Sequence, residues 1–184
     1  MPIATHGLQK AQQVKGRSPM TSFNSYFIDR SAAAKAVQLS LPMITAAMES
    51  RIAGESGFLY IVIMKPGTSA ASSSFEEAIL YEHAVGDREK WDADYAAFAR
   101  AKAQVSWKTG LDGHVVQELK PHLLERGDTV LWGGIVLDDI VVGVSGADPW
   151  YDEAFAGTIA MCLRAQAKAG IAAARKTQLF LDAK

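Results

Sequence analysis

Two short runs of β-branched residues, separated by two aspartates, constrain the fold of this chain more than any other feature. They lie in segment 133–153, which reads GGIVLDDIVVGVSGADPWYDE. Residues 138–139, Asp-Asp, tolerate the left-handed backbone of a two-residue turn, so the flanking runs are predicted to pair as a β-hairpin. The small residues at 145–147 permit close backbone approach, and Asp-Pro at 148–149 suits the cap and first turn of a helix. The segment therefore predicts a hairpin, a tight corner and a helix.

Hydrophobic periodicity predicts the remaining elements. Residues 58–64 form a continuous apolar run typical of a central strand, and residues 78–85 alternate as in a strand with one wetter face. Residues 68–74 carry only small side chains and are predicted to form a mobile loop. Helical spacing occurs over 28–54, from Asp87 to about Lys108, within 111–126, and from Pro149 to about Lys168.

The order of these elements indicates the fold class. Hairpins rather than helical crossovers join the paired strands. We therefore expect an α+β fold with a mostly antiparallel sheet flanked by helices. Residues 1–27 are expected to be an N-terminal arm that is flexible or straps a neighbouring subunit. Residues 28–176 are expected to form the folded domain, and residues 177–184 a C-terminal tail.

Pro42 interrupts the first helical region. A proline has no backbone amide hydrogen, so the helix either kinks there or gives way to a new helix that begins at Ser40. The second arrangement places Ser40 as the cap and Pro42 in the first turn, which prolines favour. We therefore expect a break at Ser40, with Ser31 as the cap of the preceding helix.

Composition limits the partners. The 184 residues carry a formal net charge of −1 and 49% of them are hydrophobic. Dispersed Lys and Arg residues offer no basic face for nucleic acid, and the first twenty residues lack the apolar core of a signal peptide or membrane span. We therefore expect a cytoplasmic protein without nucleic-acid or membrane partners. The single cysteine, Cys162, excludes an internal disulfide and favours a core thiol, and no histidine pair has the spacing of a metal site.

The glycine pair at 133–134, the hairpin, and the sequence GVSGA followed by Asp152-Glu153 resemble the signature of the GlcG/HbpS-like family, often labelled haem-degrading. The resemblance is close over segment 133–153 and looser from Leu39 to Ala174. The looser part includes a helix that carries Ala-Lys-Ala at 101–103. The chain departs from the family in its first 38 residues, in its serine-rich loop and at residue 136, where valine replaces a common proline.

The resemblance implies a profilin-like α/β sandwich that assembles into a homo-oligomer, a dimer or larger. It also implies haem as a cofactor, with assistance to haem degradation as the associated activity. Any haem would be bound non-covalently, because the C-x-x-C-H attachment motif is absent. Two other functions stay open. One is a non-haem accessory protein of a catabolic pathway that binds a small carboxylate, and the other is an oligomeric structural or interaction protein. No catalytic residue is assigned.

A lysine and an aspartate on two predicted helices are the first ligand-binding candidates. Lys102 interrupts an apolar stripe, so its ammonium either extends into water or requires an acidic partner or an anionic ligand. Asp152 falls inside the apolar arc of the last helix, where it could face Lys102. Such a pair would be a carboxylate site at the mouth of a pocket, or a structural salt bridge. The predicted ligand-binding residues are Lys102, Asp152, Ser145, Gly146, Gly133 and Gly134.

His83 is the candidate ligand for haem iron. It is predicted to share a strand face with Ile79, Tyr81 and Val85, and a histidine in such an apolar setting is able to ligate iron. The alternative is a hydrogen-bonded core histidine. His114, on the polar connection, is predicted to be a surface residue.

Overall fold

The chain was analysed as a computed structural model that describes residues 24–182, so the predicted arm is described only from Asn24 onward. Its elements, in chain order, are α1 (Arg30–Glu49), β1 (Leu59–Met64), α2 (Phe75–Ala78), β2 (Ile79–Val85), the 3-10 turn η1 (Arg88–Lys90), α3 (Tyr95–Thr109), the π-helical turn η2 (Val115–Leu119), the 3-10 turn η3 (Pro121–Leu123), β3 (Gly134–Leu137), β4 (Ile140–Ser145) and α4 (Pro149–Ala174).

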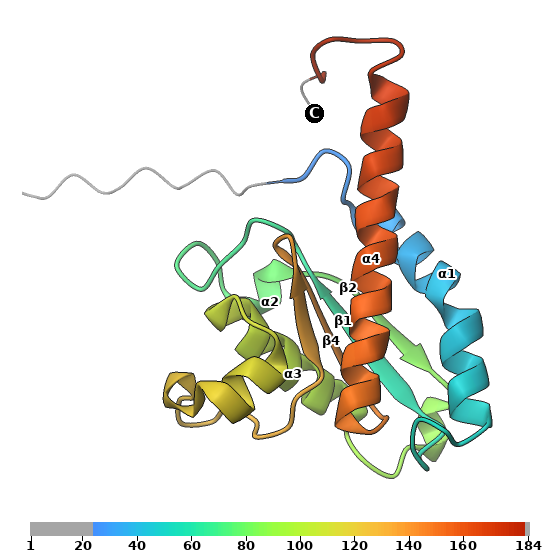
Figure 1. Cartoon of the computed structure of the whole chain (residues 1–184), viewed down its shortest axis with the longest axis vertical. Helices are drawn as coiled ribbons and strands as arrows, with labels where there is room; N and C mark the ends of the chain where they lie inside the picture. Colours follow the sequence, from blue (N-terminus) through green and yellow to red (C-terminus); the bar gives the residue numbers. More distant parts are fainter. Residues whose placement is uncertain (1–23, 183–184) are drawn as a thin grey trace, which may run out of the picture.

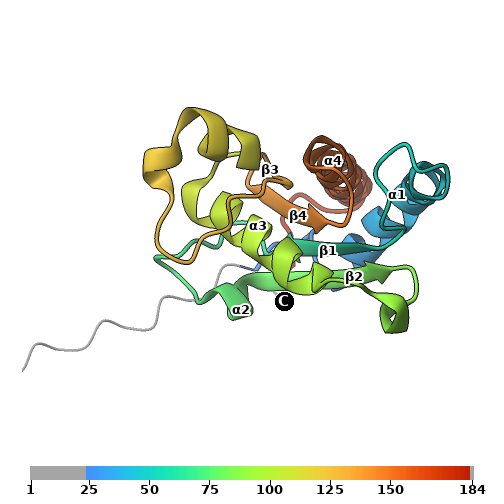
Figure 2. The same ribbon diagram turned by 90° about the horizontal axis from the view of Figure 1, so that it is seen from below.

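The four strands form one antiparallel sheet in the order β2-β1-β4-β3. Helices α1 and α4 cover one face and α3 covers the other (Figures 1 and 2). Alternate residues of β1 supply the two cores: Leu59, Ile61 and Ile63 pack toward α1 and α4, and the residues between them pack toward α3. The sheet and its flanking helices confirm the predicted α+β sandwich.

The β3-β4 hairpin confirms the prediction from its two aspartates. Asp138 and Asp139 have φ values of 49° and 64°, the left-handed conformation that this turn requires. In β4, Gly143 lies so close to α3 that an added Cβ would be 2.6 Å from the Cβ of Ala103. Small residues on both elements therefore bring α3 unusually close to the hairpin, and this proximity positions Lys102.

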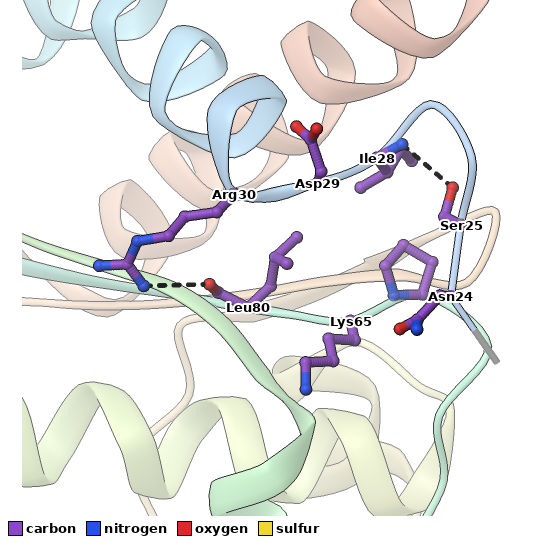
Figure 3. A pocket seen from close by; sticks show the side chains of 8 residues that line it. Asn24, Ser25, Ile28, Asp29, Arg30, Lys65 and Leu80 are labelled. Carbon is purple, nitrogen blue, oxygen red and sulfur yellow. Dashed lines mark hydrogen bonds between the residues drawn. The ribbon is translucent and has the colours of Figure 1, made fainter. Parts of the chain in front are cut away.

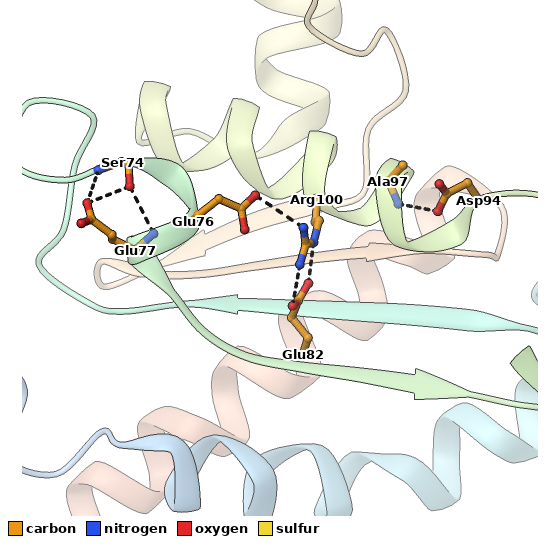
Figure 4. A network of polar contacts seen from close by, with 7 residues as sticks. All are labelled: Ser74, Glu76, Glu77, Glu82, Asp94, Ala97 and Arg100. Carbon is orange, nitrogen blue, oxygen red and sulfur yellow. Dashed lines mark hydrogen bonds and ion pairs between the residues drawn. The ribbon is translucent and has the colours of Figure 1, made fainter.

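An ion pair joins α3 to the outer strand β2 (Figure 4). Arg100 donates from Nε and Nη2 to the two carboxylate oxygens of Glu82, at 2.7 and 2.8 Å. A longer contact of 3.4 Å joins Arg100 to Glu76 of α2. These carboxylates raise the pKa of the Arg100 guanidinium. The paired hydrogen bonds fix both the position and the orientation of the guanidinium.

Two helix predictions are wrong. The break at Ser40 does not occur: α1 runs through Pro42, and its cap is Asp29 rather than Ser31. Pro42 is exposed, so water can satisfy the carbonyl group that loses its donor, while Val37 and Ile44 are buried against the core. Likewise, α4 continues past Gly170 to Ala174, and the Phe27 ring packs where a side chain at Gly170 would lie.

The start of α3 and one strand face also differ from prediction. Asp87 caps only the short turn η1, and α3 begins at Tyr95 with Asp94 as its cap. In β2 a bulge leaves Leu80 as an extra residue, because Ile63 pairs with Tyr81 while Met64 pairs with Ile79. Ile79 therefore packs toward α3, on the opposite side from Tyr81.

Three smaller predictions concern the end of α3, membrane-spanning helices and Cys162. Helix α3 ends at Thr109 as predicted, with Gly110 in the left-handed conformation that favours glycine. Within residues 24–182, no helix is both long enough and apolar enough to cross a membrane. Cys162 of α4 is partly buried and packs against the core beneath α1 and α4.

Candidate functional site

The structure brings Lys102 of α3 and Asp152 of α4 together. Lys102 Nζ donates to Asp152 Oδ2 at 2.6 Å, and the two side chains are 4% and 0% exposed. The other carboxylate oxygen, Oδ1, accepts from the backbone N–H of Ala147 at 2.9 Å. Asp152 therefore holds both the lysine and the tight corner that follows β4. The pair lies in the interior, not at the mouth of a pocket.

Burial changes the protonation of this pair. Removal from water raises the pKa of Asp152 to about 7, although Lys102 and the backbone N–H groups of Ala147 and Gly146 oppose the shift. The Lys102 ammonium already has the carboxylate as its partner. A free anion would therefore have to displace Asp152 in order to reach it.

The glycines and the serine predicted to line a ligand site pack closely around this pair. At Gly133, where φ is +145°, an added Cβ would lie 2.9 Å from both Asp152 Cβ and Lys102 Cδ. A Cβ added at Gly134 would likewise clash with Ser106 and Lys102 of α3, and one added at Gly146 would clash with the backbone at Phe58. Ser145 is 5% exposed. These residues allow β3 and the corner to close over the pair, and their role in binding a ligand stays a prediction.

His83 lies elsewhere, on the outer strand β2, facing α1. It pairs across the sheet with Ile61, whose side chain belongs to the core beneath α1 and α4. Its ring stacks on that of Tyr81, with centroids 6.2 Å apart and an interplanar angle of 17°. Tyr81 Oη and His83 Nδ1 are 3.4 Å apart, within hydrogen-bond range. Among residues 24–182 no partner is found for the second ring nitrogen, Nε2.

The surroundings of His83 favour its neutral form. The imidazole is about half buried, and this burial lowers its pKa below the ordinary value of 6.5. Near one end of β2 an open cavity of about 330 Å³ is lined by Val85, by Thr45, Met48 and Glu49 of α1, and by Arg51, which follows α1. A neutral imidazole with one nitrogen held by a tyrosine is the form in which histidine binds a metal.

Sequence reasoning missed a second histidine contact. Glu153 accepts from the backbone N–H of His114 and lies against His114 Nδ1, both at 2.9 Å. Burial raises the pKa of Glu153, whereas the contacts with His114 lower it. The pair joins the connection after α3 to the first turn of α4. The adjacent acidic residues at 152 and 153 were the available signal, but their partners lie far away in the sequence.

The fold and this geometry define the chain as an α+β sandwich with a buried lysine–aspartate pair at one corner and a half-buried histidine on its outer strand. No protein-family model and no curated protein matches the sequence. Among solved structures, the crystal structure of Klebsiella pneumoniae protein ORFY, assigned to family model DUF336, is similar to it. DUF336 is the GlcG-like family. The two chains are 15% identical, the match covers 80% of this chain and 99% of the other, and the TM-score is 0.47.

Proposed function

We propose that this domain binds haem non-covalently along the surface between α1 and β2, with His83 Nε2 as the iron ligand. The observation that carries the proposal is the state of the His83 ring. Tyr81 holds Nδ1, burial keeps the ring neutral near pH 7, and Nε2 has no partner among the described residues. We call this surface the α1–β2 seam; it extends from Arg30 and Leu80 to Met48 and Val85.

The side chains along the α1–β2 seam suit a haem group. Leu41 of α1 and Tyr81 and Val85 of β2 are partly buried apolar side chains that pack along it. An arginine stands at each end: Arg30 lies over the Tyr81 ring, 5.2 Å from its centroid, and Arg51 lines the cavity beside Val85. Apolar walls suit a porphyrin, and arginine suits the carboxylates at its edge.

A hemin titration of the purified protein, followed in the visible spectrum, tests the proposal. We expect saturable one-to-one binding with a shifted Soret band, and loss of that band in His83→Ala. His122→Ala, which removes an exposed histidine of η3, is the matched control and should titrate like the parent. Weak, non-saturable change in the parent protein, or an unchanged band in His83→Ala, would overturn the proposal.

Two further expectations, assistance to haem degradation and assembly into a homo-oligomer, belong to this proposal. Assistance to haem degradation predicts that haem bound to the protein loses its Soret band faster with a reductant and oxygen than free hemin does under the same conditions. Assembly into a homo-oligomer predicts a mass of two or more chains by light scattering during size exclusion. The alternative function, binding of a small carboxylate without haem, has less support at Lys102, because Asp152 already occupies its ammonium.

A further inference from the structure

A second, smaller cavity lies at the other end of the α1–β2 seam (Figure 3). Its volume is about 270 Å³. The segment that leads into α1 supplies part of its lining, and the end of β1 and the start of β2 supply the rest. The lining residues are Asn24, Ser25, Ile28, Asp29, Arg30, Lys65, Pro66 and Leu80. The bulge in β2 that makes Leu80 an extra residue helps to shape the cavity.

Two cations line this cavity without a carboxylate partner. Among residues 24–182, neither Arg30 nor Lys65 forms an ion pair within 4.0 Å. Each donates to a backbone carbonyl instead: Arg30 Nη1 to Leu80 at 3.5 Å, and Lys65 Nζ to Glu77 at 2.6 Å. In the view of Figure 3, Leu80 lies between these two side chains.

The nearby acidic side chains hydrogen-bond to other groups, although Glu77 is close enough to Lys65 for an attraction that contributes to the lowered pKa of its carboxyl group. Asp29 caps α1, where its carboxylate accepts from the N–H of Ala32 at 2.9 Å. Glu77 accepts from Ser74, at 3.1 Å from its backbone N–H and 2.7 Å from its hydroxyl. With two cations and one carboxylate, the lining carries a net positive charge. This balance favours an anionic ligand.

We propose that this cavity binds a small carboxylate with an apolar body. The planar guanidinium of Arg30 matches a carboxylate with two parallel hydrogen bonds, and the ammonium of Lys65 adds a second charge. Ile28, Pro66 and Leu80 offer apolar contact for the rest of the molecule. The volume lies just below the range of about 300–1,000 Å³ typical of drug-sized ligands, which limits the ligand to a small organic acid. The cavity shares Arg30 with the end of the α1–β2 seam, where its guanidinium also lies over the Tyr81 ring, but His83 is not part of its lining.

Calorimetric titration of the full chain with benzoate tests this site, with benzamide as a neutral probe of the same shape and inorganic phosphate as a second anion. We expect saturable binding of benzoate, at least tenfold weaker binding of benzamide, and weaker binding of phosphate than of benzoate. Undetectable benzoate binding, or equal affinity for benzoate and benzamide, would overturn the proposal. Tighter binding of phosphate than of benzoate would overturn its assignment to carboxylates.

Single substitutions locate the site. Arg30→Gln and Lys65→Gln should each weaken benzoate binding at least fivefold, whereas Lys35→Gln, an exposed lysine of α1 outside the cavity, should leave it unchanged. Full affinity in Arg30→Gln would contradict the assignment. His83→Ala should retain its benzoate affinity even where hemin binding is lost. The result for this cavity is therefore distinguishable from the result for haem.

Discussion

Lys102 and Asp152 join the two helical layers of this protein through a single buried contact of 2.6 Å. Lys102 belongs to α3 on one face of the sheet, and Asp152 belongs to the first turn of α4, which covers the other face. The contact lies at the corner where β4 ends, beneath Gly133. It therefore connects the two helical layers at segment 133–153, which contains the β3-β4 hairpin and the start of α4.

Removing one partner of this pair should destabilise the protein strongly. In Lys102→Met the buried Asp152 carboxyl group loses its cationic partner and must either take up a proton or stay charged without a counterion, and we expect a loss of about 3–5 kcal/mol in the free energy of unfolding at neutral pH. The double variant Lys102→Met/Asp152→Asn removes both charges and leaves an acceptor for the Ala147 N–H. It should lose less than the two single variants together. Urea unfolding measures all three, and a loss below about 1 kcal/mol in Lys102→Met would contradict this account.

Asp152 should also make stability depend on pH. Its pKa is raised from the ordinary 3.8 to about 7 in the folded chain, so between these values the folded state binds more protons than the unfolded state. The free energy of unfolding should therefore fall as pH rises from about 4 to about 7. Urea unfolding across this range should show a smaller fall in Asp152→Asn. Parallel profiles for the two proteins would show that the carboxyl group is not perturbed.

Gly133 should tolerate no side chain. In Gly133→Ala the new Cβ would lie 2.6 Å from the carbonyl oxygen of Val144, at a φ of +145° that L-residues avoid. We expect a loss of about 3 kcal/mol or more, because overpacking and backbone strain act together. Gly157→Ala is the matched control. This glycine lies inside α4 with open space around it, so the substitution should increase the free energy of unfolding by as much as about 1 kcal/mol. Thermal unfolding compares the two directly.

The two ion pairs of Arg100 should contribute unequally to the stability of the folded protein (Figure 4). Glu82 receives two hydrogen bonds from the guanidinium and is 22% exposed, whereas Glu76 makes one 3.4 Å contact and is 69% exposed. We expect Glu82→Gln to cost about 1 kcal/mol and Glu76→Gln less than about 0.5 kcal/mol, because water screens the exposed pair. Urea unfolding at low and high salt tests this order. A larger cost for Glu76→Gln would contradict it.

Local chemistry made part of this fold predictable. The Asp138–Asp139 turn and the end of α3 before Gly110 depend on backbone preferences that a few neighbouring residues set, and the structure confirms both. The angular position of Asp152 on its helix likewise followed from spacing alone. Its contact with Lys102 did not, because that contact joins positions 50 residues apart.

The failures share a physical cause, which is packing between distant segments. Helix α1 continues through Pro42 because its neighbours pack against the sheet, and α4 continues past Gly170, which packs against the distant residue Phe27. Periodicity also could not reveal the bulge that turns Ile79 away from Tyr81, because a bulge depends on pairing with β1. The contact between His114 and Glu153 was hidden for the same reason.

The most direct test of the haem proposal is chemical rescue at His83. The variant His83→Gly removes the imidazole from the α1–β2 seam and leaves room for a free one. We predict that this variant loses the shifted Soret band of the hemin complex, and that added imidazole restores it in a saturable way. An unchanged hemin complex in His83→Gly without imidazole would contradict the assignment of His83 as the iron ligand.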